Sequence, residues 1–336
     1  MDLSLFQYTY PKELIAQHPL PERDASRMMV LDRMQQSWRH ESVQRLPEYL
    51  RAGDLLVLND TKVFPARLMG EENSGRRVEI LLLESLNGNG LWRGLAKPLK
   101  KINIGDRIVF APGFNGTVVE KTLDDVVVQL ESKNLEHDIQ TVGLPPLPPY
   151  IRRKSAADYT PEDKERYQSI FARCNGSSAA PTASLHFSEA LLQTLEVQGV
   201  PTAFVTLHVS IDTFLPIREP DITQHKMHGE QFRVPQKTRD AIRKTKEAGG
   251  RVIAVGTTVV RALESNWDQS VTHHYIYPGY RFKVVDGIVT NFHQPGSTLI
   301  AMIAAFVGRT LLLQAYQEAV EKNYRLFSFG DCMLCL

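Results

Sequence analysis

The pattern of hydrophobic positions along this chain changes near residue 66 and again near residue 145. Before residue 66, apolar runs at 28–32 and 54–63 predict strands, and the continuous apolar middle of the second indicates a buried one. Between 66 and 144, short apolar stretches are separated by turn signals at 73–75, 87–90 and 112–116. Several short strands at this spacing are typical of a small all-β barrel or sandwich, which we interpret as an inserted module.

Residues 144–153 contain four prolines, which stiffen this stretch as an extended linker. Helical and strand patterns then alternate. Thr160, followed by Pro161 and two acidic residues, predicts a helix reaching 174, and Ser188 and Gly199 bracket the next helix. Further segments follow in order: a strand at 200–209, a helix at 236–250, a strand at 251–255 and a helix at 259–266.

Ser297 can cap a last helical region that runs to about 322, is interrupted near Gly308 and precedes a final strand at 325–329. This βαβα order predicts an α/β main domain. We expect that domain to be discontinuous, at 1–65 and 145–336, with a small all-β, barrel-like domain inserted at 66–144.

Composition places the chain among ordinary globular proteins, because 43% of its 336 residues are hydrophobic and its net charge is +1. The three cysteines (Cys174, Cys332 and Cys335) are too sparse for a disulfide framework, which favours a reducing compartment and a cytoplasmic location. The most apolar run, 299–307, is far shorter than the ~20 residues of a membrane span. We therefore expect neither export nor membrane insertion.

Local charge patterns leave nucleic-acid binding open. Short basic clusters can neutralise phosphates, although pattern alone favours a solvated surface. The clusters are Lys97, Lys100, Lys101 and Arg107; Arg152, Arg153 and Lys154; and Arg239, Arg243, Lys244 and Lys246.

Seven of the ten histidines lie between His186 and His293, mostly in short strings rich in Gly, Thr, Ser and Pro. Histidine titrates near neutral pH, so this concentration predicts a proton-transferring or ligand-orienting site in the C-terminal half. His225, His228 and Glu230 form an H-x-x-H-x-E string, but zinc requires three or four ligands and the helical metalloprotease pair is spaced i, i+4. We therefore favour hydrogen bonding or acid/base work over a metal site.

The strand at 251–255 runs into Gly256, Thr257 and Thr258 and then into a helix. At such a junction the helical N–H groups attract anions, so the turn and Arg261 are candidates for holding a carboxylate. A structural turn explains the same residues equally well.

Tyr275, Tyr277 and Tyr280 surround a Pro-Gly turn and can either stack on a purine or cation or simply pack together. Cys332 and Cys335 fit a terminal strand better than a redox or zinc motif, since the chain has no second pair.

Taken together, these strings resemble those of the S-adenosylmethionine:tRNA ribosyltransferase-isomerase family of queuosine synthesis. The resemblance covers essentially the whole chain. It rests on LIAQHPLPERDASRMMVLDR, LVLNDTKVFPARL, LAKP, LPPYI, AAPTASLHF, TLHV, HKMHGE, VGTTVVRALES, YIYPGY, VDGIVTNFH and FSFGD. The family's α/β domain with an inserted β-barrel agrees with the organisation predicted above.

The resemblance implies that S-adenosylmethionine donates its ribosyl moiety to 7-aminomethyl-7-deazaguanine in tRNA, giving epoxyqueuosine tRNA, adenine and methionine. The sulfonium acidifies the C5′ hydrogens, so a base is required, and the candidates are His186, His208, His228 and His293. The sequence does not say which of them acts. By hypothesis, Gly256, Thr257, Thr258 and Arg261 hold the methionine carboxylate, Tyr277 and Tyr280 stack near the adenine or the cation, and Asp331 binds a ribose hydroxyl or an ammonium. A monomer without metal is expected.

Several positions depart from the family pattern. They are Ser184, Ser210 and Asp212 at usual glycines, Val259 at a usual serine, Gly296 at a usual lysine and a shortened stretch at 266–274. The lost glycines can narrow a pocket, so a diverged paralogue with another acceptor stays open. A tRNA-binding protein of the same fold that has lost catalysis also stays open, and a metal hydrolase is a distant third reading.

Overall fold

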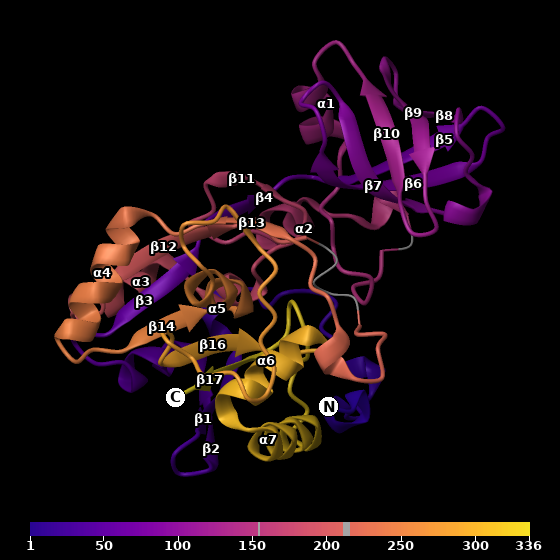
Figure 1. The fold of residues 1–336 in the computed structure, drawn as a ribbon. Coiled ribbons are helices and arrows are strands. Elements are labelled where there is room, and N and C mark those ends of the chain that lie inside the picture. The colour runs from indigo at the N-terminus through magenta and orange to yellow at the C-terminus, as the bar shows by residue number, and fades with distance from the viewer. Residues whose placement is uncertain (154, 211–215) are drawn as a thin grey trace.

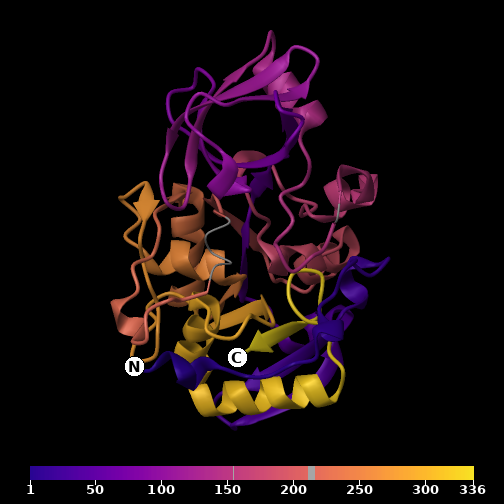
Figure 2. The ribbon, with the colours of Figure 1, turned by 90° about the vertical axis from the view of Figure 1, so that its right-hand side faces the viewer.

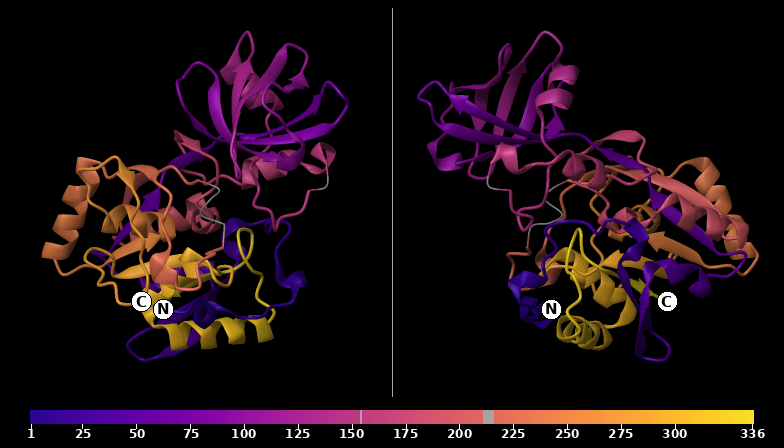
Figure 3. Two further views of the ribbon diagram at one scale, coloured as in Figure 1. Left: turned by 45° about the vertical axis from the view of Figure 1, so that its right-hand side comes forward. Right: turned by 180° about the vertical axis from the view of Figure 1, so that it is seen from behind.

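The computed structural model describes residues 1–153, 155–210 and 216–336. It consists of a large α/β body and a β-barrel that lies on one side of it (Figure 1). The two views in Figure 3 show the same arrangement from other directions, with the barrel resting against one edge of the body. The α/β body with a barrel confirms the fold class expected from the sequence.

Within the described residues, nine strands form one sheet in the α/β body. Across the sheet their order is β15 (Val271–Thr272), β13 (Glu230–Arg233), β12 (Thr202–Leu207), β3 (Leu55–Asn59), β14 (Val252–Val255), β16 (Gly287–Asn291), β17 (Cys332–Cys335), β1 (Arg27–Asp32) and β2 (Ser37–Ser42). The central strands β12, β3, β14 and β16 are parallel neighbours, whereas β13 and β17 run antiparallel to them. The central strands therefore end at one common edge.

Helices cover both faces of this sheet, which explains its continuous apolar strands. Alternate residues of β3 point to opposite layers: Leu55 and Val57 join the core beneath α4 to α7, and Leu56 and Leu58 join the core beneath α3. The helices are α3 (Glu189–Val197), α4 (Gln236–Glu247), α5 (Thr257–Glu264), α6 (Thr298–Val307) and α7 (Arg309–Glu321). Helix α7 lies at the end of the molecule opposite the barrel (Figures 1 and 2).

Six strands between residues 67 and 131 close into an antiparallel barrel in the order β10-β7-β6-β5-β8-β9, and Figure 2 shows them as a ring. Their bounds are β5 (Arg67–Glu72), β6 (Arg77–Ser85), β7 (Leu91–Lys97), β8 (Arg107–Ala111), β9 (Phe114–Lys121) and β10 (Val126–Glu131). Helix α1 (Leu135–Val142) follows β10. The short strands β4 (Thr61–Val63) and β11 (Cys174–Ser177) pair in parallel near the junction with the body.

Most predicted helix starts are confirmed, because Thr160, Ser188 and Ser297 each accept a backbone N–H as N-caps. Two predictions were wrong. Helix α2 (Pro161–Arg166) ends well before residue 174, because the backbone N–H groups of Arg173 and Cys174 bond Asp60 O instead. The segment 325–329 is not a strand, since Phe327 has a φ of 69°, and the last strand is β17.

Among the described residues, no single helix is long and apolar enough to cross a membrane. Helices α6 and α7 reach such a length only as a pair, which is bent by 115°.

Candidate functional site

Polar residues follow the central strands at the edge where these strands end together. Asn59 is the last residue of β3, His208 follows β12, Gly256 follows β14 and Asn291 ends β16. In an open α/β sheet this edge is where ligands bind, because the loops there converge from several strands. The strand ends therefore mark the candidate site.

Asn59 ties three of these segments together through its fully buried side chain. Its Nδ2 donates to Leu207 O (2.9 Å) and to Thr258 Oγ1 (3.2 Å). Its Oδ1 accepts from the backbone N–H groups of Thr61 and Leu207, both at 3.1 Å. One amide thus uses both donors and its acceptor to fix the ends of β3 and β12 and the start of α5.

His208 is held by the two residues that follow Asn59. Its Nδ1 lies 2.8 Å from Thr61 Oγ1 in a hydrogen bond. Partial burial lowers the pKa of the His208 imidazole, and the negative charge of Asp60 opposes that shift. Asp60 itself accepts from Thr206 Oγ1 (2.6 Å) and Arg173 Nε (2.7 Å). His208 is consequently a half-buried imidazole that favours its neutral form.

Gly176 packs directly against the His208 ring, where a larger residue would not fit. The glycine has a φ of +143°, and an added Cβ would lie 2.8 Å from His208 Cε1. Any side chain at position 176 would therefore collide with the imidazole.

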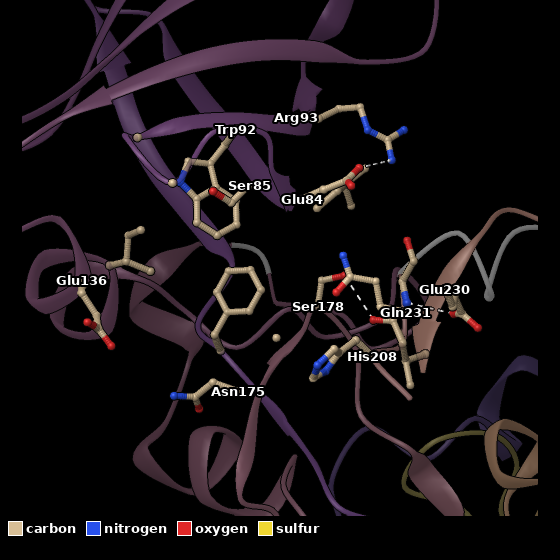
Figure 4. A pocket seen from close by; sticks show the side chains of 18 of the residues that line it. Glu84, Ser85, Trp92, Arg93, Glu136, Asn175, Ser178, His208, Glu230 and Gln231 are labelled. Carbon is tan, nitrogen blue, oxygen red and sulfur yellow. Dashed lines mark hydrogen bonds and ion pairs between the residues drawn. The ribbon is translucent and has the colours of Figure 1, made fainter. Parts of the chain in front are cut away.

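A cavity of about 590 Å³ lies between the barrel and this edge of the sheet. In Figure 4, Glu84, Trp92 and Arg93 approach it from the barrel, and Asn175, Ser178, His208 and Gln231 approach it from the α/β body. A volume of this size falls in the range of ~300–1,000 Å³ that suits a small organic ligand. The cavity continues into a second one of about 560 Å³, with which it shares Leu83, Arg93, Ser210, His228 and Glu230.

The predicted histidines separate in space. His208 and the exposed His228 line the large cavity. His293 and the Gly256–Thr258 turn instead line a neighbouring cavity of about 40 Å³, in which Thr290 Oγ1 and His293 Nε2 are 2.7 Å apart. His186 lies elsewhere on a short 3-10 helix, Thr182–His186, with its Nε2 3.1 Å from Asn291 Nδ2.

Burial makes His186 and His293 neutral at physiological pH. It lowers the pKa of His293 to about 3. Burial, together with the positive charges of Arg325 and Arg23, lowers the pKa of His186 to about 4. Both rings act as hydrogen-bonding groups within the fold.

The Gly256–Thr258 turn has the predicted strand-turn-helix form. Gly256 has a φ of +91° and caps α5, and Thr257 and Thr258 are its first residues. Val209 lines both this small cavity and the large one. The turn is therefore adjacent to the large cavity.

Three other predicted ligand-binding residues already have partners inside the protein. Arg261 forms a fully buried ion pair with Glu230 and also donates from Nε to His274 O (3.2 Å). Tyr280 donates to Glu264 Oε2 (3.0 Å), and Tyr277 packs on Tyr275 with ring centroids 5.1 Å apart. Neither tyrosine lines the two large cavities.

Asp331 has a structural position. Its carboxylate accepts from the backbone N–H groups of Arg27 (3.0 Å) and Arg325 (2.8 Å) and from Arg27 Nε (3.2 Å). These bonds join the starts of β1 and β17, which lie side by side in the sheet.

In the part of the chain that the structure describes, no group of three His, Cys, Asp or Glu side chains is arranged to hold a metal ion. His225 of the H-x-x-H-x-E string pairs through Nδ1 with Glu219 Oε2 at 2.9 Å. Cys332 and Cys335 are buried in β17, as expected for a terminal strand.

The positions that depart from the family pattern have varied surroundings. Ser184 and Val259 are fully buried, and Ser184 does not have a positive φ. Ser210 donates its backbone N–H to Glu230 Oε1 (3.0 Å), and Asp212 lies outside the described residues. Gly296 has a φ of +64°, and a Cβ there would lie 2.6 Å from Gln7 Nε2, so glycine suits this chain at that position.

Sequence patterns alone did not single out Asn59, Asp60 and Thr61 on the sheet side or Trp92 and Glu136 on the barrel side. The first three had a visible signal, since a polar triplet directly follows a buried strand of an α/β sheet. The barrel residues had none, because nothing in the sequence says which end of the barrel meets the body.

Comparisons with known proteins agree over the whole chain. Residues 3–335 match a family model described as queuosine biosynthesis protein. The S-adenosylmethionine:tRNA ribosyltransferase-isomerases of Caldanaerobacter subterraneus subsp. tengcongensis and Halothermothrix orenii are 44% and 46% identical to it, each covering 100% of both chains. The crystal structure of the S-adenosylmethionine tRNA ribosyltransferase of Thermotoga maritima, 36% identical, matches 99% of this chain and 100% of its own with a TM-score of 0.56.

We expect Asn59→Leu to lower the free energy of unfolding by about 3 kcal/mol or more, because backbone groups of Leu207 and Thr61 would stay buried without partners. Urea unfolding followed by circular dichroism measures this. Asn73→Leu in the exposed turn after β5 is the matched control. A loss below about 1 kcal/mol for Asn59→Leu would contradict the role of this amide.

The pKa of His208 should lie below the ordinary value of about 6.5, and Asp60→Asn should lower it further by removing the opposing negative charge. An NMR titration of the His208 Cε1–H resonance in both proteins measures the two values. A higher pKa in Asp60→Asn would show that Asp60 does not act on this ring.

Replacement of Glu230 by Leu should cost about 3 kcal/mol of stability, because it leaves the Arg261 guanidinium buried without its carboxylate. The double variant Glu230→Leu/Arg261→Met should recover most of that loss, since no buried charge remains. Thermal and urea unfolding of the variants test this, and a double variant as unstable as the single one would contradict it.

Proposed function

Because this chain belongs to the queuosine biosynthesis protein family, we propose that its reaction takes place in the cavity between the barrel and the strand ends. Like the relatives that match it end to end, it is an S-adenosylmethionine:tRNA ribosyltransferase-isomerase, and hence a transferase. The acceptor in this proposal is 7-aminomethyl-7-deazaguanine in tRNA, and the products are epoxyqueuosine tRNA, adenine and methionine. A cytoplasmic monomer that uses no metal is part of the same proposal.

The position of His208 carries this proposal. Among the four candidate histidines, His208 is the one that is half-buried and also lines the large cavity. Its lowered pKa keeps the imidazole unprotonated at neutral pH, as a base must be. A C5′ hydrogen of S-adenosylmethionine is acidified by the adjacent sulfonium, and removing it requires such a base in a largely enclosed site.

The hydrogen bond to Thr61 selects the reactive nitrogen of His208. When Nδ1–H donates to Thr61 Oγ1, the lone pair of the neutral ring lies on Nε2. Nε2 then takes the C5′ proton. Thr61 is a positioning residue here, since Asn59 fixes its backbone N–H and it in turn orients the imidazole.

Two further roles are proposed for groups that line the large cavity or lie next to it. His228 lines the same cavity and supplies the proton that the departing adenine requires. The Gly256–Thr258 turn, next to the cavity, holds the methionine carboxylate through its hydroxyls and the N–H groups that begin α5. Arg261 has no part in that contact, because it is committed to Glu230.

Two alternatives to this function are a non-catalytic tRNA-binding protein and a transferase with another acceptor. Each would give different products from the same reaction mixture. S-adenosylmethionine and tRNA bearing the aminomethyl base should yield adenine and an epoxyqueuosine nucleoside. Binding without adenine release would indicate the first alternative. Adenine release without that nucleoside would indicate the second.

We expect His208→Gln to lower kcat by at least about 100-fold and to abolish exchange of the C5′ hydrogens with solvent deuterium, because the base is gone. His228→Gln should retain this exchange and lose adenine release. Mass spectrometry of recovered S-adenosylmethionine and chromatography of adenine measure the two steps.

His40→Gln on the exposed strand β2 is the matched control and should keep full activity. Normal exchange in His208→Gln, with the protein folded, would remove this residue as the base.

A further inference from the structure

Two aromatic rings line the cavity, one from the barrel and one from the segment that leads into it. Phe64 and Trp92 line the cavity with ring centroids 5.5 Å apart and planes tilted by 43°. Trp92 is only half-buried, and Figure 4 shows its indole projecting from the barrel into the pocket. Aromatic faces of this kind stack on nucleobases and attract cations.

One carboxylate on the cavity wall is available for a ligand. Glu84, Glu136 and Glu230 all line the cavity. Glu84 pairs with Arg93 (3.2 Å), and Glu230 pairs with Arg261. Glu136, in the first turn of α1, has no ion pair among the described residues. Its negative charge therefore lacks a protein cation to neutralise it.

An aromatic face and a carboxylate without an ion pair, lining the same cavity, suit a planar ring that carries a positive charge. The acceptor of the proposed function has this chemistry, because a purine-like base bears an aminomethyl group that is protonated at neutral pH. S-adenosylmethionine also carries cations, but the proposed function places its carboxylate at the Gly256–Thr258 turn, which lines the neighbouring small cavity and not this wall.

We infer that Trp92, Phe64 and Glu136 form the subsite for the acceptor base, with the deazaguanine ring stacked on Trp92 and its ammonium paired with Glu136. This inference rests on the proposed function and assigns the barrel a role in choosing the acceptor. A base in a single-stranded anticodon loop can be splayed out into such a pocket, where stacking offsets the contacts it loses. The donor and the acceptor thus occupy different parts of the site.

The test compares Glu136→Gln with wild-type protein, with Glu131→Gln at the end of β10 as the matched control. The substrates are S-adenosylmethionine and tRNA bearing the aminomethyl base. The same tRNA with guanine at that position serves as a competitive inhibitor. Loss of the charged contact should raise KM for the aminomethyl tRNA about tenfold and leave KM for S-adenosylmethionine unchanged.

A second readout separates recognition from mere structural support. Glu136→Gln should lose the preference for the aminomethyl tRNA over the guanine tRNA, since the ammonium is the difference between them. Trp92→Ala should weaken both tRNAs by about tenfold, and Trp92→Phe should restore most of that loss, because stacking tolerates either ring.

Two results would overturn the assignment of this subsite to the acceptor base. A raised KM for S-adenosylmethionine instead of tRNA would assign the wall to the donor and overturn the inference, as would an unchanged tRNA preference in Glu136→Gln. If wild-type protein releases no adenine, the proposed function fails. Equilibrium binding of the two tRNAs to the same variants then still tests the subsite, and equal binding by wild-type protein and Glu136→Gln would refute it.

Discussion

The buried amide of Asn59 is the constraint on which the candidate site depends. A strand that ends inside a protein leaves backbone N–H and C=O groups that must find partners. At the end of β3 one side chain supplies partners for three such groups and for a threonine hydroxyl. Those bonds fix Thr61, the end of β12 and the start of α5 relative to one another. His208 and the Gly256 turn therefore owe their relative positions to this residue rather than to direct contact with each other.

The inserted barrel completes a site that the α/β body only begins. The chain leaves β3 through the polar triplet at 59–61, and Phe64 then leads into the barrel. This brings a second wall, with Trp92, Glu84 and Arg93, to the edge where the strands end. A cavity between two bodies can enclose reactants better than a strand edge alone, and exclusion of water strengthens electrostatic interactions inside it.

The partners of buried charged groups and the burial of imidazole rings were the hardest features to predict from the sequence. Arg261 reads in the sequence as a candidate carboxylate binder, yet the fold commits it to Glu230 from a strand 31 residues away. His186 and His293 read as potential bases, yet burial removes them from the large cavity and lowers their pKa values far below neutrality. Asp331 joins two strands. In each case the residue type was informative, and its partner depended on contacts distant in sequence.

The sequence by itself determined the α/β class, the presence of a small β-barrel module, the caps at Thr160, Ser188 and Ser297, and the family. These follow from periodicity, from capping bonds within four residues and from the order of short motifs, all of which are local. Tertiary structure alone decided that the helix after Thr160 ends at Arg166 and that residues 325–329 bend at Phe327, because long-range bonds to Asp60 and a left-handed backbone outweigh local preference. It also decided which of the four histidines line the large cavity. That choice depends on strand order and on the placement of the barrel, neither of which local propensity encodes.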